Sequence, residues 1–451
     1  MKKFNKNKFL TEDKKNIQLD KFAEFLIEEH GCCLIDGKPG TYRPQDGVYS
    51  CEDDEIEQVV WNYFPGLTSH KRTEIVKAVR LMLNMKGKVK ETDDYKHLIA
   101  FRNGVYNLDT KELLPFSKDY IILNKINWNY NPNAKSKYVD SMLDKISCFD
   151  PEIRAIMEEL VGYAMYRGLE YDTAFILVGS KARNGKSTFT GILEHLLGRK
   201  NCSSADLRKV CDIKDEYTQA KLYGKLANIG DDISGEYIPD PSTFKSITSG
   251  ETVQARQIYG KPFEFKPYAT MIFSANNIPK IKDADNGVKR RMKIIPFDFQ
   301  FDPNAADFDR NFENKLKKGA PDCPADDSMS YLINLGLAGL DRVFNTGDFT
   351  VSQKVEAALE EYNKECNPIL AWIEEYLFEN TTFCDKRRDL VYDNYKMWCD
   401  RSGQKAMAQT SFVRFINDKY DLEVVPKHYS TINEEGEKIN KTIRTFVSKD
   451  E

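Results

Sequence analysis

The spacing of apolar positions predicts helices near the start of the chain. Apolar residues fall three and four positions apart in three segments, which is the pattern of an amphipathic helix. These segments are residues 20–30, 53–63 and 69–85. Residues 98–108 read instead as two short apolar runs around Asn103 and Gly104, which predicts a strand, a tight turn and a second strand. Residues 1–150 are therefore expected to form a small α+β module, with a linker at residues 131–136.

Short apolar runs alternate with helical patterns in the middle of the chain. Residues 151–168 predict a helix with proline in its first turn and glycine at its end. Buried strands are predicted at residues 173–178, at residues 226–230, at residues 269–275 and directly after Arg291. This alternation is typical of an α/β sheet with parallel strands. We expect one α/β domain over residues 151–303, with residues 304–365 as its helical part.

The last part of the chain, residues 366–451, reads as three helices followed by two strands. The predicted helices are residues 367–376, 388–400 and 410–420, and the predicted strands are residues 421–425 and 441–447. This order favours a winged helix, in which the third helix can enter a DNA groove and the hairpin forms the wing. The candidate contacts are Ser411, Arg414 and Asn417 on the helix and Lys438, Lys441 and Arg444 on the wing. Because acidic residues are about as frequent there as basic ones, a protein-binding or structural winged helix is nearly as well supported.

Composition sets limits on the function. The 451 residues are 41% apolar and 30% charged, which is enough apolar material for packed cores. The net charge of −4 argues mildly against a nucleic-acid partner, unless positive charge is concentrated on one surface, such as the channel wall of a ring. Apolar runs stay well short of the ~18 residues of a membrane span, and the N-terminus lacks the apolar core of a signal peptide. We therefore expect no membrane partner.

The ten cysteines and five histidines do not predict a metal or disulfide site. Cys32 and Cys33 are adjacent, and no CxxC pair occurs. We expect reduced, mostly structural cysteines in a reducing compartment.

The strongest chemical signal is the segment FILVGSKARNGKSTF at residues 175–189. A buried strand runs into a polar loop that ends in Gly185, Lys186 and Ser187 and opens a helix over residues 186–197. Backbone amides of such a loop converge on phosphate oxygens, the lysine reaches the β- and γ-phosphates, and the serine hydroxyl binds Mg²⁺. The candidate nucleotide-binding residues are Gly179, Ser180, Arg183, Asn184, Gly185, Lys186, Ser187 and Thr188.

The loop departs from the usual spacing. Five residues instead of four separate Gly179 from Gly185. Either the loop carries one extra residue or Ser180 takes the place of the first glycine. The strand–loop–helix context still favours nucleotide binding over an incidental glycine turn, with ATP as the nucleotide and Mg²⁺ as its metal.

Two carboxylates follow a predicted strand further along the chain. Asp231 and Asp232 lie in the run LANIGDDI, after the strand that starts at residue 226. Adjacent carboxylates repel each other unless a metal or solvent relieves the repulsion. We expect Asp231 to join Ser187 on the Mg²⁺ shell and Asp232 to be the base that polarises the attacking water. A solvated Asp-Asp turn is the alternative.

Two further segments supply polar groups for hydrolysis. The strand at residues 269–275 is followed by Asn276, an amide that can bind the attacking water and the γ-phosphate; a simple turn is the alternative. Arg290 and Arg291 precede the next strand, and an arginine from a neighbouring subunit can stabilise the charge of phosphoryl transfer. We expect Arg291 to act in this way, with Arg290 second and a solvated or DNA-contacting basic pair as the alternative.

Residues 244–265 read as a helix, a glycine break and two strands around a turn. The turn carries Tyr259 and Lys261, an aromatic and a base that can contact the backbone and the bases of a single DNA strand. An ordinary surface hairpin is the alternative.

Taken in this order and at these separations, the motifs resemble those of superfamily 3 helicases. The likeness extends to the phage and plasmid primase-type group that includes the poxvirus primase-helicases. It rests on NGKSTF, the strand before Asp231 and Asp232, residues 244–265, the strand before Asn276 and Asn277, and Arg290 with Arg291. Residues 101–110 also resemble the domain that precedes the motor in that group.

This resemblance implies a compact AAA+ P-loop core of the superfamily 3 type. It implies ATP sites between the subunits of a homohexamer, Mg²⁺ dependence and 3′-to-5′ movement on single-stranded DNA. Single-stranded and forked DNA are then the partners, in replication of a virus, phage, plasmid or mobile element, and the location is the cytoplasm of a bacterial host. The N-terminal module would serve oligomerisation or DNA engagement. It is too short for a fused primase domain, so a separate primase or origin-binding protein is a candidate partner.

Two other functions remain open. An origin-binding initiator would use ATP to assemble the ring, and strand displacement on forked DNA separates it from a helicase. A P-loop phosphotransferase for a small molecule would have no use for an arginine from a neighbouring chain.

Overall fold

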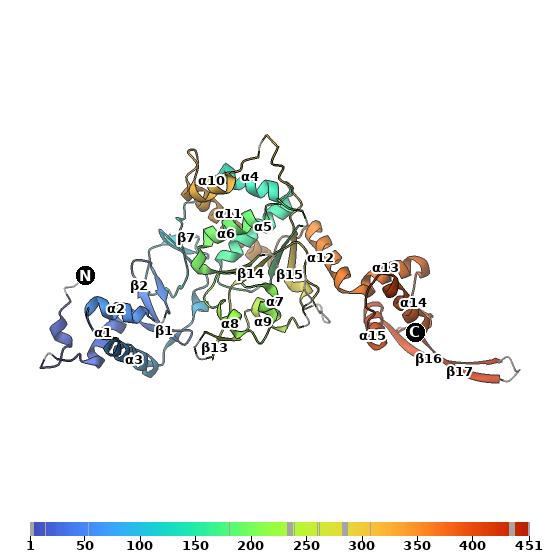
Figure 1. Cartoon of the computed structure of the whole chain (residues 1–451), viewed down its shortest axis with the longest axis horizontal. Coiled ribbons are helices and arrows are strands. Elements are labelled where there is room, and N and C mark those ends of the chain that lie inside the picture. Colours follow the sequence, from blue (N-terminus) through green and yellow to red (C-terminus); the bar gives the residue numbers. More distant parts are fainter. Residues whose placement is uncertain are drawn as a thin grey trace. The chain divides into compact units, whose positions relative to one another are not determined.

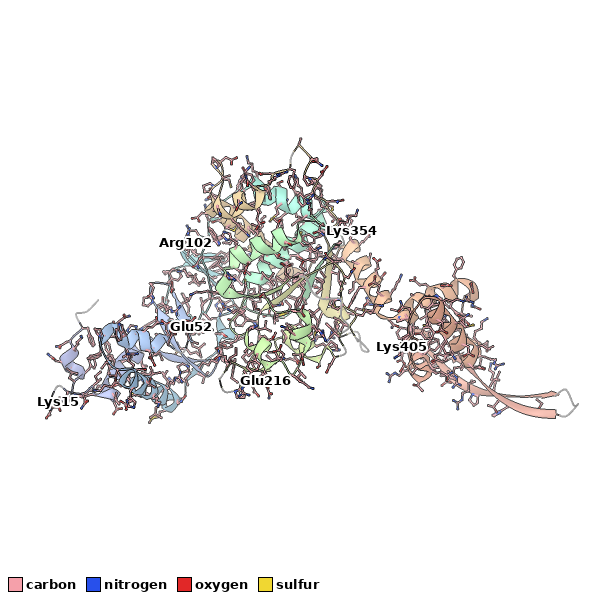
Figure 2. All side chains as sticks on the ribbon, in the orientation of Figure 1. Lys15, Glu52, Arg102, Glu216, Lys354 and Lys405 are labelled. Atoms are coloured by element: carbon pink, nitrogen blue, oxygen red, sulfur yellow. The ribbon has the colours of Figure 1, made fainter. Side chains whose placement is uncertain are left out.

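The computed structural model describes residues 4–13, 15–52, 54–179, 181–231, 238, 240–258, 260, 262–281, 287–306, 308–432 and 438–449. Four predicted site residues, Ser180, Asp232, Tyr259 and Lys261, lie outside them. The chain forms two compact units, Met1–Glu356 and Ala357–Glu451 (Figure 1). Charged side chains such as those of Lys15, Glu52 and Lys354 lie on the surface (Figure 2).

The helices predicted at the start of the chain are confirmed. They are α1 (Leu19–Glu29), α2 (Glu55–Tyr63) and α3 (Ser69–Lys86), preceded by the 3-10 turn η1 (Lys6–Phe9). The Thr68 hydroxyl accepts a hydrogen bond from the backbone amide of Lys71 at the start of α3. Phe22, Leu26 and Val79 are among the residues that form the core between these helices. Helical spacing of apolar residues was therefore sufficient to locate them.

Two small sheets complete this part of the chain. The first has the strand order β3-β2-β1-β4 and the second has the order β7-β6-β5-β8. Their elements are β1 (Cys33–Ile35), β2 (Lys38–Arg43), β3 (Val48–Ser50), β4 (Val89–Lys90), η2 (Thr92–Tyr95), β5 (Leu98–Phe101), β6 (Gly104–Asn107), β7 (Glu112–Leu114) and β8 (Lys125–Ile126). β5 and β6 pair antiparallel with Phe101 opposite Gly104, which confirms the predicted strand, turn and strand.

A five-stranded parallel sheet forms the centre of the first unit. Its order is β10-β11-β14-β9-β15, and each neighbouring pair is parallel. The strands are β9 (Ala174–Val178), β10 (Cys202–Ser203), β11 (Ala227–Gly230), β14 (Thr270–Ala275) and β15 (Met292–Pro296). The predicted α/β class with parallel strands is confirmed. β14 lies between the strand that leads to Asp231 and the strand that leads to the predicted phosphate-binding loop, residues 179–185, called the phosphate loop below.

Helices pack against this sheet and against one another. They are α4 (Lys137–Ile146), α5 (Pro151–Met165), α6 (Lys186–Leu197), α7 (Leu207–Cys211), α8 (Glu216–Ala220), α9 (Ser242–Thr248), α10 (Phe312–Lys318) and α11 (Ala325–Thr346), with the 3-10 turns η3 (Arg199–Asn201) and η4 (Lys289–Arg291). α5, α6 and α11 lie together beside the sheet (Figure 1) and share one core with Phe175 and Ile272. That core includes Phe101 and Met142, so the second small sheet and α4 pack against the central sheet domain.

α5 ends earlier than the sequence predicts. The Asp150 side chain accepts two backbone amide hydrogen bonds at its start, as expected of an N-cap. The sequence predicts continuation to residue 168, but Tyr166 is already extended, with φ −86° and ψ 147°. The next residue, Arg167, is buried and donates to three backbone carbonyls of the N-terminal part. Tertiary contacts of this arginine therefore replace the last predicted helical turn.

A two-stranded hairpin follows α9. β12 (Val253–Arg256) and β13 (Pro262–Phe265) pair antiparallel, after a break at Gly250 with φ 65°. The predicted helix, glycine break and two strands are thus confirmed, whereas the predicted contact residues of the turn lie outside the described part.

The second unit contains three helices and a long hairpin, in the predicted order. After α12 (Gln353–Cys366) come α13 (Pro368–Asn380), α14 (Arg388–Arg401), α15 (Gln409–Tyr420), β16 (Leu422–Ile432) and β17 (Lys438–Ser448). Both strands are longer than predicted, 11 residues each, and they pair from Leu422 opposite Ser448 to Ile432 opposite Lys438. The prediction was too short because the apolar alternation ends before the backbone pairing, which continues through polar positions. Identification as a winged helix, and the domain boundaries within each unit, stay predictions.

All ten cysteines are free thiols in the structure. Within the described part of the chain, no three His, Cys, Asp or Glu side chains stand close enough to hold a metal ion. Nor does that part contain a helix long and apolar enough to cross a bilayer.

Candidate functional site

The carboxyl ends of three neighbouring strands bring the predicted polar residues to one edge of the parallel sheet. In the register, Val178 of β9 lies opposite Ala275 of β14. The residues that follow β9, β14 and β11 are Gly179, Asn276 and Asp231. Parallel strands end at the same edge of a sheet, where ligands of α/β proteins bind. The loop, the amide and the carboxylate therefore face the same space.

Gly185 lies where only glycine fits. It precedes α6 with a φ of 89°, in the left-handed region. A Cβ atom at this position would lie 2.7 Å from Cγ2 of Ile146 and 3.1 Å from Cε2 of Phe301. The phosphate loop is therefore packed between α4 and the segment that follows β15.

Asn184 holds the loop closed from inside. Its side chain is 5% exposed, and Nδ2 donates to the carbonyl of Gly179 at 3.2 Å. Oδ1 accepts from the backbone amide of Lys186 at 3.5 Å. A Cβ atom on Gly179 would lie 2.2 Å from Nδ2, so the close approach requires glycine. This bond across the loop explains how the five-residue spacing still gives a closed turn.

Lys186 lies folded over the loop and is 7% exposed. Its Nζ donates to the carbonyl of Gly179 at 2.5 Å and to Oδ1 of Asn276 at 3.3 Å. The ammonium thus links the ends of β9 and β14. This cation can exchange one of these neutral oxygens for a phosphate oxygen, which gives a stronger, charge-assisted hydrogen bond.

Ser187 and Asp231 suit a magnesium ion by their chemistry. Ser187 is exposed in the first turn of α6, and Asp231 is exposed directly after β11. Mg²⁺ binds oxygen ligands and keeps several waters, so one hydroxyl and one carboxylate fit its protein ligand set beside a nucleotide. Thr188 is half-buried in the same turn. The predicted role of Asp232 lies outside the described residues.

The two candidate arginines differ in exposure. Arg291 is 7% exposed. Its guanidinium donates to the Gly287 carbonyl at 2.8 Å and to the Ser249 hydroxyl at 2.7 Å, and it lies 3.3 Å from the Asp172 carboxylate. Arg290 is exposed. Because Arg291 is held within its own chain, the geometry favours Arg290 as the residue that can reach a neighbour.

Both arginines lie at the amino-terminal ends of the parallel strands, whereas the phosphate loop lies at their carboxyl ends. They precede β15, whose first residue, Met292, pairs with Ala174 at the start of β9. The loop follows the other end of β9. Neither arginine can therefore serve the nucleotide site of its own chain without crossing the length of the sheet.

A cavity beside the phosphate loop was not predicted from the sequence. It has a volume of about 380 Å³, and Arg183, Gly185 and Thr188 form the wall on the loop side. The apolar residues of the other walls are Met142, Ile146, Phe299, Phe301, Ala305, Phe308 and Phe312. The amide of Phe301 donates to the carbonyl of Arg183 at 3.0 Å, which fixes this wall to the loop. The aromatic run PFDFQF at residues 296–301 was the available signal, but it reads equally well as the end of a strand.

The predicted DNA contacts of the second unit are placed only in part. Arg414 on α15 and Arg444 on β17 are exposed. Ser411 and Asn417 were expected to be exposed but are half-buried, because α15 turns its neighbouring apolar residues into the core. Lys441 belongs to β17, and its side chain, like that of Lys438, lies outside what the structure describes.

Two family models match separate parts of the chain. A D5 N-terminal-like family matches residues 19–148, and a family of unknown function, DUF5906, matches residues 177–291. The second match contains the phosphate loop, Asp231, Asn276 and both arginines. The first contains the two small sheets and the helices up to α4.

Among curated proteins, the chain is similar to viral proteins named as helicases and primases. It is 26% identical over 331 residues to "Putative helicase L207/L206" of Acanthamoeba polyphaga mimivirus, covering 69% of this chain and 34% of the relative. It is 25% identical over 365 residues to "Putative helicase 184R" of Invertebrate iridescent virus 6, covering 72% of this chain and 36% of the relative. It is 20% identical over 244 residues to "Putative primase C962R" of African swine fever virus (isolate Tick/Malawi/Lil 20-1/1983), covering 51% of this chain and 25% of the relative. The chain thus spans about a third of the length of the helicase relatives and a quarter of the primase.

Among solved structures, the fold is similar to the apo C-terminal region of NrS-1. The TM-score is 0.53 at 14% identity, and the alignment covers 95% of this chain and 98% of that chain. This likeness supports the fold over both units. By its sequence likeness to these viral proteins and to the D5 N-terminal-like family, the chain fits the primase-helicase group.

Proposed function

We propose that this chain is the ATP-driven motor of a helicase that acts in the DNA replication of a virus, phage, plasmid or other mobile element. One observation carries the proposal: the phosphate loop, Asn276 and Asp231 follow the carboxyl ends of three neighbouring parallel strands, and Nζ of Lys186, at the start of α6, lies 3.3 Å from Asn276 Oδ1. A lysine, a carboxylate and an amide around a phosphate loop are the groups that nucleoside triphosphate hydrolysis needs. The names of the viral relatives favour a helicase motor over a phosphotransferase.

The residues at this edge have distinct tasks. Lys186 leaves the Gly179 carbonyl and binds the β- and γ-phosphates of ATP, while Ser187 and Asp231 hold the Mg²⁺ shell. The bound metal supplies neutralisation of the charge on the transferred phosphoryl group. Asn276 orients the attacking water, and Asp232 remains the candidate base that accepts its proton.

The cavity beside the loop suits the nucleoside part of ATP. Its volume of about 380 Å³ lies within the usual range of small-molecule sites. The planar rings of Phe299 and Phe301, with centroids 4.7 Å apart, provide an apolar surface for a base. Because Gly185 and Thr188 line the same cavity, a base there and phosphates on the loop can belong to one nucleotide.

We further propose that the chain works as a homohexamer on DNA. An exposed Arg290 at the edge opposite to the loop can complete the site of a neighbouring copy, which requires a ring of shared sites. The β12–β13 turn, with Tyr259 and Lys261, would follow the single strand 3′ to 5′, and Arg414, Lys441 and Arg444 would contact duplex or forked DNA. A separate primase or origin-binding protein stays a candidate partner. The candidate location is the cytoplasm of the host cell.

Strand displacement on forked DNA tests the proposal. The unaltered chain should unwind the fork with ATP and Mg²⁺, and Lys186→Ala should abolish both ATP hydrolysis and unwinding. Lys88→Met, which removes a lysine at an exposed position of the N-terminal part, is the control and should keep both activities. Site-specific duplex binding and ATP hydrolysis without unwinding would favour the origin-binding initiator. That alternative is supported by the exposed Arg414 and Arg444 of the second unit.

A further inference from the structure

One lysine of the N-terminal part contacts the β12–β13 hairpin. Lys38 opens β2, and its Nζ lies 3.5 Å from the ring centroid of Tyr223 and 3.8 Å from that of Phe263. Both distances are well inside the ~6 Å range of a cation–π interaction. Lys38 lies in the segment matched by the D5 N-terminal-like family, and both rings lie in the segment matched by DUF5906. The contact thus joins the two matched parts of the chain.

The aromatic rings beside this lysine lie on one face of the hairpin and pack against one another. Phe263 and Phe265 are alternate residues of β13 and so point to the same side of the hairpin. Tyr223 packs edge-on against both of them, with ring centroids 5.7 Å and 5.4 Å apart. The Tyr223 hydroxyl is buried, and burial raises the pKa of this phenol, so the ring stays neutral below the cation. Lys38 therefore closes an aromatic cluster to which β13 contributes two of three rings.

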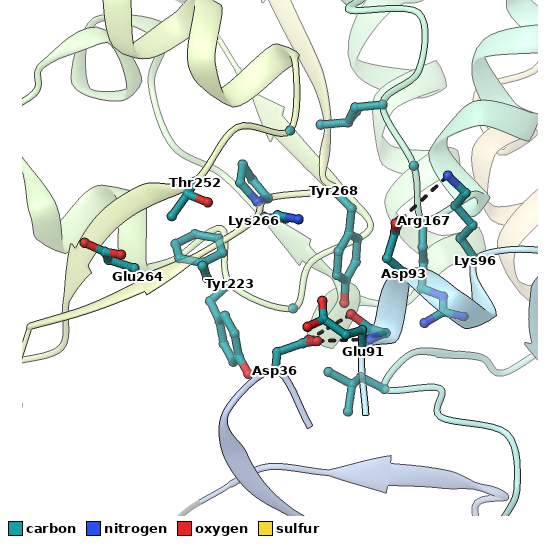
Figure 3. A pocket seen from close by; sticks show the side chains of 18 of the residues that line it. Asp36, Glu91, Asp93, Lys96, Arg167, Tyr223, Thr252, Glu264, Lys266 and Tyr268 are labelled. Atoms are coloured by element: carbon teal, nitrogen blue, oxygen red, sulfur yellow. Dashed lines mark hydrogen bonds and ion pairs between the residues drawn. The ribbon is translucent and has the colours of Figure 1, made fainter. Parts of the chain in front are cut away.

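A cavity lies beside this contact, between the N-terminal part and the hairpin. Its volume is about 480 Å³, and Figure 3 shows Asp36, Tyr223 and Glu264 around it. Its wall includes Gly37, which directly precedes Lys38, and Phe265 at the end of β13. Where a cavity separates two walls, few atoms touch across it and little dispersion energy holds them together. The contact of Lys38 with Tyr223 and Phe263 lies beside this cavity and helps to fix the position of the hairpin.

We propose that the N-terminal module positions the β12–β13 hairpin through Lys38, so that Lys38 is a positioning residue for the engagement of DNA by this hairpin. The restraint on the hairpin follows from the geometry alone, whereas its use in DNA engagement rests on the proposed function. A cation–π contact is strong enough to favour one position of a small hairpin and weak enough to be broken when the hairpin moves.

Hydrogen exchange of the full chain, followed by mass spectrometry, tests the restraint. Lys38→Met keeps the length of the side chain and removes its charge, and Lys38→Arg keeps the cation. In Lys38→Met, we expect amides of residues 253–265 to exchange about ten-fold faster than in the unaltered chain, the ratio that corresponds to about 1.4 kcal/mol. Lys38→Arg should restore slow exchange, and the control Lys88→Met should leave it unchanged.

Two results would overturn the restraint. One is unchanged exchange of the hairpin in Lys38→Met. The other is faster exchange that is equally large in β5 and β6, because Lys38 would then stabilise its own module rather than the hairpin.

ATP hydrolysis with and without single-stranded DNA tests the functional part on the same variants. Basal hydrolysis by Lys38→Met should stay within about two-fold, whereas its stimulation by DNA should fall about five-fold and return in Lys38→Arg. Faster exchange of the hairpin combined with full stimulation would overturn the role in DNA engagement and leave the restraint standing. Absence of ATP hydrolysis in the unaltered chain would instead refute the proposed function itself.

Discussion

At the scale of single residues, the contact between Lys186 and Asn276 connects the loop to the middle strand of the site. Asn276 directly follows β14, and Lys186 opens α6 after the loop that follows the neighbouring strand, β9. The lysine is 7% exposed, so its ammonium has lost most of its water, and the oxygens of Gly179 and Asn276 replace part of it. Small changes at these oxygens should therefore affect hydrolysis more than binding.

Replacement of Asn276 tests this role. In Asn276→Ala, we expect the turnover number for ATP to fall about 100-fold, because the water and the γ-phosphate lose an oriented partner in the transition state. The dissociation constant for ATP, measured by calorimetry, should change less than about three-fold, since Lys186 and the loop amides remain. Asn277→Ala is the matched control, an exposed neighbour that should hydrolyse ATP normally. Equal activity in both variants would rule out Asn276 as the residue that orients water.

Replacement of Phe301 tests the base cavity. Phe301→Ala removes one ring of the wall, so ATP should bind about ten-fold more weakly, whereas inorganic tripolyphosphate, which has no base, should bind as before. Lys186→Ala should weaken both ligands. Phe378→Ala, at a 90% exposed position of the second unit, is the control for loss of a phenylalanine. If Phe301→Ala weakens both ligands equally, the ring supports the loop and does not bind the base.

At the scale of elements, α5 and α11 form the closest helix pair of the described core. A Cβ atom on Gly162 of α5 would lie 2.0 Å from the carbonyl oxygen of Gly336 on α11, and one on Gly339 would lie 2.6 Å from the backbone of Glu158. At the exposed side of this crossing, Arg342 donates to Glu158 at 2.9 Å. Small residues at the crossing thus decide how closely the two helices approach behind the sheet.

A single methyl group at this crossing should destabilise the fold. Gly162→Ala places its Cβ against backbone, which is unable to move aside, so we expect a loss of about 1–3 kcal/mol in the free energy of unfolding. Gly191→Ala on α6 is the matched control, because its nearest contact is the flexible end of Lys317 at 3.1 Å. It should be neutral or slightly stabilising, since alanine favours a helix interior. Urea denaturation followed by circular dichroism compares the two, and equal midpoints would contradict the close crossing.

At the scale of the whole molecule, the position of the arginines opposite to the phosphate loop argues for sites shared between copies. In the proposed mechanism, a chain that carries its loop at one end of the parallel strands and an exposed arginine at the other lacks an arginine at its own site. A second copy in the right orientation supplies what is missing. When each copy contacts the next in this head-to-tail manner and the last copy contacts the first, the assembly is a ring.

Mixing two inactive variants tests the shared site. Lys186→Ala and Arg290→Ala should each lose ATP hydrolysis when pure, and a mixture of the two should regain part of it, because some interfaces then combine an intact loop with an intact arginine. Arg291→Ala should instead lose stability, since its guanidinium bonds to Ser249 and lies beside Asp172. Light scattering in ATP and single-stranded DNA gives the mass of the assembly. No recovery of activity in the mixture, with full-speed hydrolysis by a monomer, would refute the shared site.

Local sequence was sufficient for the parts of this protein that depend on neighbouring residues. The periodicity of apolar residues located α1, α3 and α6, the Asn-Gly turn located β5 and β6, and the strand–loop–helix pattern located the phosphate loop. These features succeed because helices, tight turns and glycine-rich loops are determined by interactions within about ten residues. The likeness to primase-helicases followed from the order of such local motifs.

Only the tertiary structure decided which of these segments meet. It placed β14 between β9 and β11, buried Arg291 while leaving Arg290 exposed, ended α5 before Arg167, and opened a cavity between α4 and the phosphate loop. Each of these depends on contacts between residues far apart in sequence, which carry no periodic signal along the chain. The same reason hid the contact of Lys38, a residue of the N-terminal part, with the rings of Tyr223 and Phe263.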